Sequence, residues 1–253
     1  MTSLKEFSKD AIIYGLGNGL KKFIGLFLLP FYTRALTPSD YGIIETLSVF
    51  VFFVTALFDL GINASTGRYY YMAKTEYEKG RVLFTGLIMR LLIIIPTVVL
   101  SLFSKSISIL FFGSDQYTWL IFVTCMIIPF NLLNQEQTNI LRFIRAPWKY
   151  NVVTLLKMIM GLTFGISLVV FLKKGPLGAQ LATLFTGILL FFFSFFYYNR
   201  KRYTYKFSPY WAKRMLNFGF PMIWASIATW VFQVSDRYFL LYYQNTTAIG
   251  LYS

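Results

Sequence analysis

The sequence contains no histidine and a single cysteine, Cys125. The lack of histidine excludes histidine-based acid–base catalysis and histidine metal ligands. One cysteine cannot form an internal disulfide. A Walker phosphate loop is also missing, and the glycine-rich segment 15–19 lacks the dinucleotide-binding fingerprint. We therefore expect no cofactor, no metal site and no catalytic residues, and we find no sign of a nucleotide-driven machine.

Charged residues are scarce, at 13% of the 253 residues, whereas 57% are hydrophobic. A soluble domain keeps about a quarter of its residues charged so that its surface stays hydrated. Aromatic residues reach 20%, which is typical of lipid-facing helices with interfacial belts. The composition therefore predicts an all-α, multi-pass membrane protein.

Apolar runs long enough to span a bilayer, about 20 residues each, recur along the chain. The first carries Lys21 and Lys22 and is too long for a cleaved signal peptide. An eighth run begins at Ala248. The seven predicted spans are Ala11–Thr33, Tyr41–Ala64, Val82–Phe103, Tyr117–Leu141, Asn151–Leu172, Leu177–Tyr198 and Met215–Tyr242.

The lysines and arginines outside the spans are distributed unequally between alternate loops. Fifteen of them fall in one set of loops, within segments 5–9, 68–81, 142–149 and 200–214. The other set holds four: Arg34, Lys105, Lys173 and Lys174. Because loops rich in cations stay in the cytoplasm, the N-terminus is predicted to be cytoplasmic. The same rule explains the net charge of +14 without a nucleic-acid partner.

A weak internal repeat divides the chain. KDAIIYG at 9–15 opens the first span and KRMLNFG at 213–219 opens the seventh, 204 positions later. Six spans separate the copies, so both enter the membrane from the same side, as in a parallel repeat of two lobes. We therefore predict one six-helix lobe over residues 1–205 and the start of a second lobe over residues 206–253.

Charged residues within the spans are expensive to place in lipid, so most of them are expected to face the interior of the bundle. Helical spacing places them on narrow polar stripes, such as Glu45, Ser48, Thr55 and Asp59 in the second span. The third span gives Gly86, Arg90, Thr97 and Ser101, and the fourth gives Asn131, Asn134, Gln135 and Thr138. Several such stripes in one bundle predict a shared hydrated cavity. The alternative for the uncharged members is hydrogen bonding between packed helices.

Two candidate groups follow from the helix faces. A cationic group for the cavity comprises Lys21, Lys22, Arg90 and Lys157, with Asn18 beside them. Asp59 and Glu136 are candidates for ion coupling, because a buried carboxylate can take up a proton. Charges near the outer membrane surface form a candidate outer gate: Arg34, Glu45, Asp236 and Arg237. Arg237 could instead extend to the interface.

The segment LPFYTRALTPSDYG at 29–42 resembles the first outer loop of bacterial polysaccharide flippases, including those for O-antigen. SDRYFL at 235–240 and AIGLYS at 248–253 resemble the seventh helix of that family and the start of the eighth. These flippases belong to the multidrug/oligosaccharidyl-lipid/polysaccharide exporter superfamily. The resemblance implies a MATE-like N-terminal lobe of six helices followed by the beginning of the second lobe.

The resemblance also implies a function and a location. The family moves an undecaprenyl-diphosphate-linked oligosaccharide outward across the bacterial cytoplasmic membrane by alternating access, in polysaccharide biosynthesis. A polysaccharide polymerase and other proteins of the export pathway would be partners. On this hypothesis the lipid diphosphate contacts the cationic group of the cavity. One alternative is a cation-coupled multidrug exporter of the same superfamily, and another is a membrane-embedded glycosyl- or acyltransferase.

Overall fold

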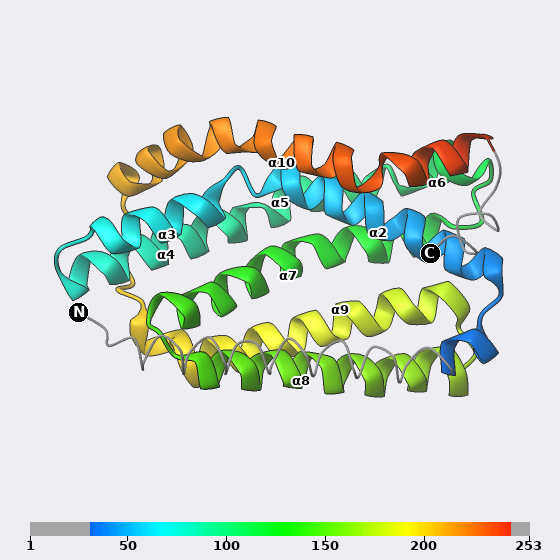
Figure 1. Ribbon diagram of the computed structural model, residues 1–253, viewed down its shortest axis with the longest axis horizontal. Helices are drawn as coiled ribbons and strands as arrows, with labels where there is room; N and C mark the ends of the chain where they lie inside the picture. The colour runs from blue at the N-terminus through cyan, green and yellow to red at the C-terminus, as the bar shows by residue number, and fades with distance from the viewer. Residues whose placement is uncertain (1–30, 244–253) are drawn as a thin grey trace.

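The computed structural model describes residues 31–243, except for the side chains of residues 230 and 232–243. The described chain is a bundle of long, roughly parallel and antiparallel helices without strands, as predicted (Figure 1). The helices are α2 (Pro38–Phe58), α3 (Ile62–Met72), α4 (Glu76–Leu92), α5 (Ile94–Leu102), α6 (Ser104–Phe112), α7 (Thr118–Phe143), α8 (Pro147–Gly165), α9 (Gly175–Ser194) and α10 (Pro209–Tyr243). Short π-helical turns at Ile166–Phe171 and Phe195–Asn199 extend α8 and α9.

Five of the described helical segments are long and apolar enough to cross a membrane. They are Pro38–Phe58, Glu76–Leu102, Thr118–Phe143, Pro147–Phe171 and Gly175–Arg202, and they match the second to sixth predicted spans. The first predicted span lies almost wholly outside the described residues, as does the first copy of the repeat. The seventh span falls within α10. The chain is therefore a multi-pass membrane protein.

The sequence TPSD at 37–40, within the segment 29–42, forms the N-terminal cap and first turn of α2. Thr37 precedes α2, and its hydroxyl oxygen accepts a hydrogen bond from the Asp40 backbone N–H at 3.2 Å. The Asp40 carboxylate in turn accepts from the Thr37 backbone N–H at 2.9 Å. This reciprocal arrangement satisfies backbone donors that the first turn of a helix leaves free, and Pro38 has no such donor.

Helix α7 is central in the bundle and packs against α2, α4, α5, α6 and α9 (Figure 1). The main core is formed by buried aliphatic side chains of α2, α3, α4 and α7, including Leu47, Ile62, Leu83 and Leu132. A smaller core around Leu190 joins α7, α8 and α9. α7 therefore separates α4 on one side from α8 on the other.

Helix α10 packs along α2, α3 and α4. Large apolar side chains on the part of α10 with described side chains are exposed, including Phe220 at 64% and Trp224 at 69%. In a membrane protein these apolar side chains must be covered by lipid or by other protein.

The cation-rich loops gather at one end of the bundle. In Figure 1 the α3–α4 turn, the α7–α8 turn and the α9–α10 connection lie at the same end, drawn on the left. The Thr204 backbone N–H donates a 3.2 Å hydrogen bond to the Gly80 carbonyl oxygen, which joins the α9–α10 connection to the start of α4. The cation-poor α5–α6 and α8–α9 regions lie at the opposite end.

Candidate functional site

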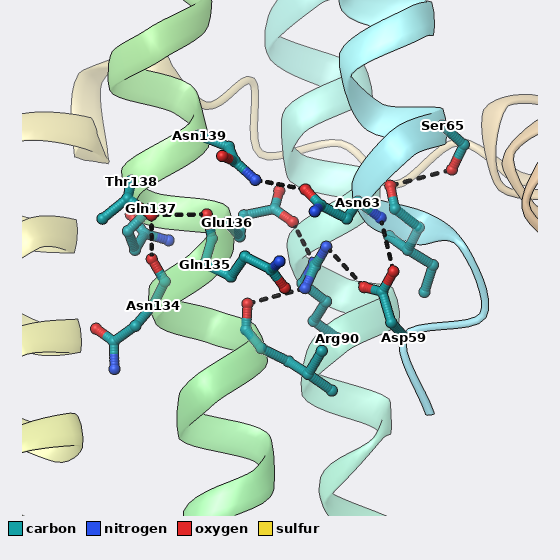
Figure 2. Close-up of polar contacts among 12 residues, drawn as sticks. Asp59, Asn63, Ser65, Arg90, Asn134, Gln135, Glu136, Gln137, Thr138 and Asn139 are labelled. Atoms are coloured by element: carbon teal, nitrogen blue, oxygen red, sulfur yellow. Dashed lines mark hydrogen bonds and ion pairs between the residues drawn. The ribbon is translucent and has the colours of Figure 1, made fainter. Parts of the chain in front are cut away.

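The second predicted span is interrupted where its polar stripe ends. Helix α2 stops at Phe58, and α3 starts at Ile62. Leu60 and Gly61 between them adopt left-handed backbone conformations, with φ of 49° and 65°. This break ends the helical ladder next to Asp59 and turns its carboxylate toward the interior, where Figure 2 shows it facing Arg90.

Arg90 lies in the last turn of α4 and is completely buried, between α3 and α7 (Figure 2). One terminal nitrogen lies 3.1 Å from Asp59 Oδ1, and Nε lies 2.5 Å from Glu136 Oε2 on α7. The other terminal nitrogen donates a 2.9 Å hydrogen bond to the Leu132 carbonyl oxygen. The guanidinium is thus held on three sides by three parts of the chain. We call Asp59, Arg90 and Glu136 the ion triad.

The charges of the ion triad do not balance when both acids are ionised. Two carboxylates then face one guanidinium, which leaves one negative charge in excess. The Glu136 and Asp59 side chains are exposed by only 1% and 18%, so water can screen little of that excess. A proton or a monovalent cation on the carboxylates would neutralise the site.

Gly86 makes the close approach of α3, α4 and α7 possible. It lies one turn before Arg90 on the same face of α4. A Cβ atom there would lie 2.9 Å from Thr66 Oγ1 and 3.1 Å from Glu136 Oε1, closer than ordinary contacts. The predicted stripe of the third span is buried at all four positions, Gly86, Arg90, Thr97 and Ser101. That stripe therefore faces the interior of the bundle.

A second polar cluster follows the ion triad toward the cation-rich end. Gln137, next to Glu136, donates a 2.9 Å hydrogen bond to the Tyr203 hydroxyl oxygen, and Asn199 donates to the Gln137 side-chain oxygen at 2.9 Å. Burial raises the pKa of Tyr203 well above its ordinary value, and the charge of Glu136 adds to the effect. On the other side, Asn139 donates to Asn63. Sequence reasoning missed these residues, although Glu136, Gln137 and Asn139 are close in sequence.

A groove opens between α2, α7 and α9. Its volume is about 350 Å³, and the polar side chains that line it are Ser48, Thr55, Asn131, Gln180 and Thr183. Three of them belong to the predicted stripes of the second and fourth spans. Gln180 and Thr183 were missed, and their spacing of three residues in an apolar helix is the signal that could have identified them. Asn134 instead bonds the Gly187 carbonyl of α9 at 2.8 Å, which is the helix-packing role considered above.

The remaining predicted residues are dispersed. Lys157 is exposed on α8, and α7 lies between it and Arg90. Arg34 is exposed, and Glu45 is half-buried on α2. Lys21, Lys22 and Asn18 lie outside the described residues. Asp236 and Arg237 are on α10, in the part of the helix whose side chains the structure does not describe.

Two solved structures share the arrangement of these helices. One is titled as the outward-facing conformation of a multidrug resistance MATE family transporter of the MOP superfamily. It has a TM-score of 0.67 and 17% identity, and the match covers 88% of this chain and 52% of that chain. The other is titled as the inward-facing conformation of such a transporter, with a TM-score of 0.65, 16% identity and coverage of 95% and 56%. The chain therefore has the MATE transporter fold, as the resemblance implied.

The sequence assigns the chain to a family within this class. The profile of the family described as "Polysaccharide biosynthesis protein" matches residues 7–253, and the chain belongs to that family. A curated relative, "Lsg locus putative protein 1" of Haemophilus influenzae, is 23% identical over 250 residues. The match covers 97% of this chain and 59% of the relative, so the chain spans about three fifths of that protein's length. The family predicted from the segment at 29–42 is confirmed.

Proposed function

We propose that this chain is part of a flippase that moves an undecaprenyl-diphosphate-linked oligosaccharide across the bacterial cytoplasmic membrane. The observation that carries this proposal is the groove of uncharged polar side chains between α2, α7 and α9. The polysaccharide biosynthesis family and the transporter fold support it. The proposal concerns the whole protein, of which this chain would supply one lobe and the helix leading onward.

The chemistry of the groove suits a sugar. Hydroxyl and amide groups can donate and accept hydrogen bonds, and they exchange them with sugar hydroxyls at little net free-energy change. The apolar residues beside them, such as Val51 and Phe52, offer faces on which sugar rings can pack. A glycan leaving water would thus find replacements for its hydration inside the membrane.

The diphosphate needs cations, and the structure narrows the choice among the predicted ones. Arg90 is buried and already engaged with two carboxylates, which favours its role in the ion triad over contact with the substrate. Lys21, Lys22 and Lys157 remain the proposed ligands of the diphosphate, with Asn18 beside them. No covalent chemistry is required, so the proposed protein is not an enzyme.

The ion triad is the proposed coupling site. Uptake of a proton by Asp59 or Glu136 would remove the excess negative charge and weaken the hold on Arg90. Because Arg90 on α4 links the α2–α3 break to α7, the charge state of the two acids would alter the packing of these segments. Ion binding could in this way shift the equilibrium between conformations of the lobe.

Alternating access is supported by how the chain compares with two transporter states. Its TM-scores to the outward-facing and inward-facing structures, 0.67 and 0.65, are nearly equal. In a two-lobed transporter of this fold, alternating access would move one lobe relative to the other. We propose the cation-rich end as cytoplasmic, and the candidate gate of Arg34, Glu45, Asp236 and Arg237 at the other end. A polymerase acting on the exported glycan would be a partner.

The test uses the full-length protein in a bacterial strain that lacks its own flippase, with the amount of externally accessible lipid-linked glycan as the readout. Asn131→Leu combined with Gln180→Met should lower export about tenfold, as expected for the loss of one or two hydrogen bonds. The matched control is Thr163→Val at an exposed position of α8, where the only hydrogen bond of the hydroxyl to the described residues goes to the Ile159 carbonyl oxygen of the same helix. Unchanged export in the double variant, at equal protein levels, would refute the proposal.

A multidrug exporter is the second candidate, because both solved structures carry that title. Exporters of cationic drugs need an acidic residue at the substrate, and the groove lining within residues 31–243 holds none. Drug susceptibility in the same strain separates the two functions. Export of glycan without drug resistance is the expected result.

A further inference from the structure

A second and larger cavity lies at the cation-rich end of the bundle. Its volume is about 750 Å³, and it lies between the start of α8 and the end of α9. Two segments about 50 residues apart in sequence form it: Lys149 from α8, and the stretch 196–205 after α9. We call this hollow the basic cavity.

Four cations line the basic cavity: Lys149, Arg200, Lys201 and Arg202. No acid lines it, and none of the four forms a salt bridge within the described part of the chain. Lys149 Nζ lies 5.7 Å from the centre of the Tyr198 ring, a cation–π distance. All four side chains are exposed, and their shared positive charge would attract an anion into the cavity. The rule that cations collect in cytoplasmic loops accounts for their number, but it does not require them to converge on one hollow.

The wall of the basic cavity is fixed by hydrogen bonds. Tyr203 is buried and anchored by Gln137 of α7, and the Tyr205 hydroxyl donates to the Arg200 carbonyl oxygen at 2.9 Å. These bonds hold the backbone that carries three of the four cations. The cavity is therefore preorganised, which lowers the entropic penalty of binding a ligand.

The surroundings of the basic cavity match the surface of a membrane. It lies at the ends of two candidate spans, Pro147–Phe171 and Gly175–Arg202. Phe196 and Tyr197 at its edge are exposed by 58% and 76%, as in an interfacial aromatic belt. Phe192, one helical turn before Phe196, extends the exposed apolar surface along α9. An acyl chain could lie along this surface while its phosphate occupies the cavity.

We propose that the basic cavity binds the phosphate headgroup of an anionic phospholipid of the surrounding leaflet. A phospholipid fits better than a soluble anion, because the cavity combines cations with an aromatic rim and an adjoining lipid-facing helix. Basic pockets between membrane helices on the cytoplasmic side recognise such headgroups in this way. The inference does not depend on which substrate the protein transports.

The experiment titrates full-length protein in neutral detergent with phosphatidylglycerol, and native mass spectrometry counts the bound lipid. The test variant is K149Q/R200Q/K201Q, and the matched control K105Q/K173Q/K174Q removes three cations at the opposite end. We expect the test variant to bind phosphatidylglycerol about 10- to 100-fold more weakly, and the control to bind like wild type. Equal loss in both variants, or no loss in either, would overturn the proposal.

Two further measurements test whether the bound phosphate belongs to a lipid and whether the result depends on correct folding of the variant. Inorganic pyrophosphate is added as competitor: failure to displace the lipid supports a membrane ligand, whereas displacement at similar concentrations overturns it. A photoactivatable phosphatidylglycerol is crosslinked to the wild-type protein, so the result does not depend on a variant that folds. Crosslinks within 196–205 are expected, and crosslinks spread over all lipid-facing helices would contradict the proposal.

Discussion

Gly61 and Gly219 meet backbone to backbone, where the break between α2 and α3 touches α10. A Cβ atom on Gly61 would lie 2.3 Å from the Gly219 carbonyl oxygen, and one on Gly219 would lie 2.3 Å from the Leu60 carbonyl oxygen. No side chain larger than hydrogen fits at either position. The break that positions Asp59 is therefore also a point of close backbone contact with α10.

Gly61→Ala should destabilise the protein more than Gly113→Ala. Both glycines have positive φ, 65° and 69°, so both substitutions add the same backbone strain. Within the part of the chain that the structure describes, a Cβ on Gly113 meets nothing within 4 Å, whereas one on Gly61 meets α10. The additional overpacking should amount to about 1–3 kcal/mol. Thermal unfolding in detergent measures the difference, and equal melting temperatures would show that α10 is not packed against the break.

Gly86→Ala should be harmful, whereas Gly161→Ala should be neutral or mildly stabilising. Both glycines lie inside helices, where alanine is favoured by about 0.5–1 kcal/mol. The new methyl group at position 86 would meet Thr66 and Glu136, but at position 161 it meets nothing within 4 Å among the described residues. We therefore expect lower thermal stability and weaker glycan export for Gly86→Ala alone. Wild-type behaviour of both variants would contradict the tight contact of α3, α4 and α7.

Arg90→Met should destabilise the protein by about 3–5 kcal/mol, because it leaves the buried Glu136 carboxylate and the half-buried Asp59 carboxylate without a counter-charge. Adding Asp59→Asn and Glu136→Gln should restore much of the stability, since the triple variant buries no charge. Export should stay low in the triple variant, because the proposed coupling groups are gone. Cys125 is buried, so its reaction with a thiol dye on heating reports unfolding. Export at the wild-type level in the triple variant would remove the ion triad from the mechanism.

Tyr203→Phe should make stability less sensitive to alkaline pH. Burial raises the pKa of Tyr203 in the folded protein above the ordinary value of 10.0. The folded state then retains a proton that the unfolded state releases, so this stabilising effect is complete below pH 10 and is lost as the pH rises above it. Phenylalanine cannot ionise, so the variant should not lose stability in this way above pH 10. At pH 8 the variant should be less stable than wild type by about 1–3 kcal/mol, because the Gln137 side chain loses its hydrogen-bond acceptor. Parallel pH profiles for variant and wild type above pH 10 would contradict the buried position of Tyr203.

Membrane topology can be tested with single cysteines at opposite ends of the bundle. In a Cys125→Ala background, Lys105→Cys should react with a membrane-impermeant reagent added to intact cells. Lys74→Cys, in the cation-rich α3–α4 turn, should react only after the cells are opened. Both side chains are exposed in the structure, so access to the reagent depends on the side of the membrane. Labelling of position 74 from outside would reverse the proposed orientation.

Local rules are sufficient for much of the fold. The length and polarity of apolar runs predicted the second to sixth spans with ends that differ from the observed ones by at most six residues, because a helix in lipid must satisfy its own backbone hydrogen bonds. The stripe from Gly86 to Ser101 was placed correctly on the buried face, since helical periodicity depends only on sequence spacing. The segments at 29–42, 235–240 and 248–253 identified the family.

The partners of each polar residue depended on the tertiary structure. Periodicity placed Arg90 on an inner face, but it could not show that Asp59 and Glu136 meet it there, because three helices distant in sequence must pack together first. Nor could it separate Asn131, which lines the groove, from Asn134, which bonds α9, since both positions lie on the same predicted stripe. The sequence by itself determined the membrane-spanning helices, their polar faces and the family. Only the packing of α7 between α4 and α9 decided which charged side chains pair and where a groove stays open, because electrostatic and hydrogen-bond energies depend on distances across the bundle.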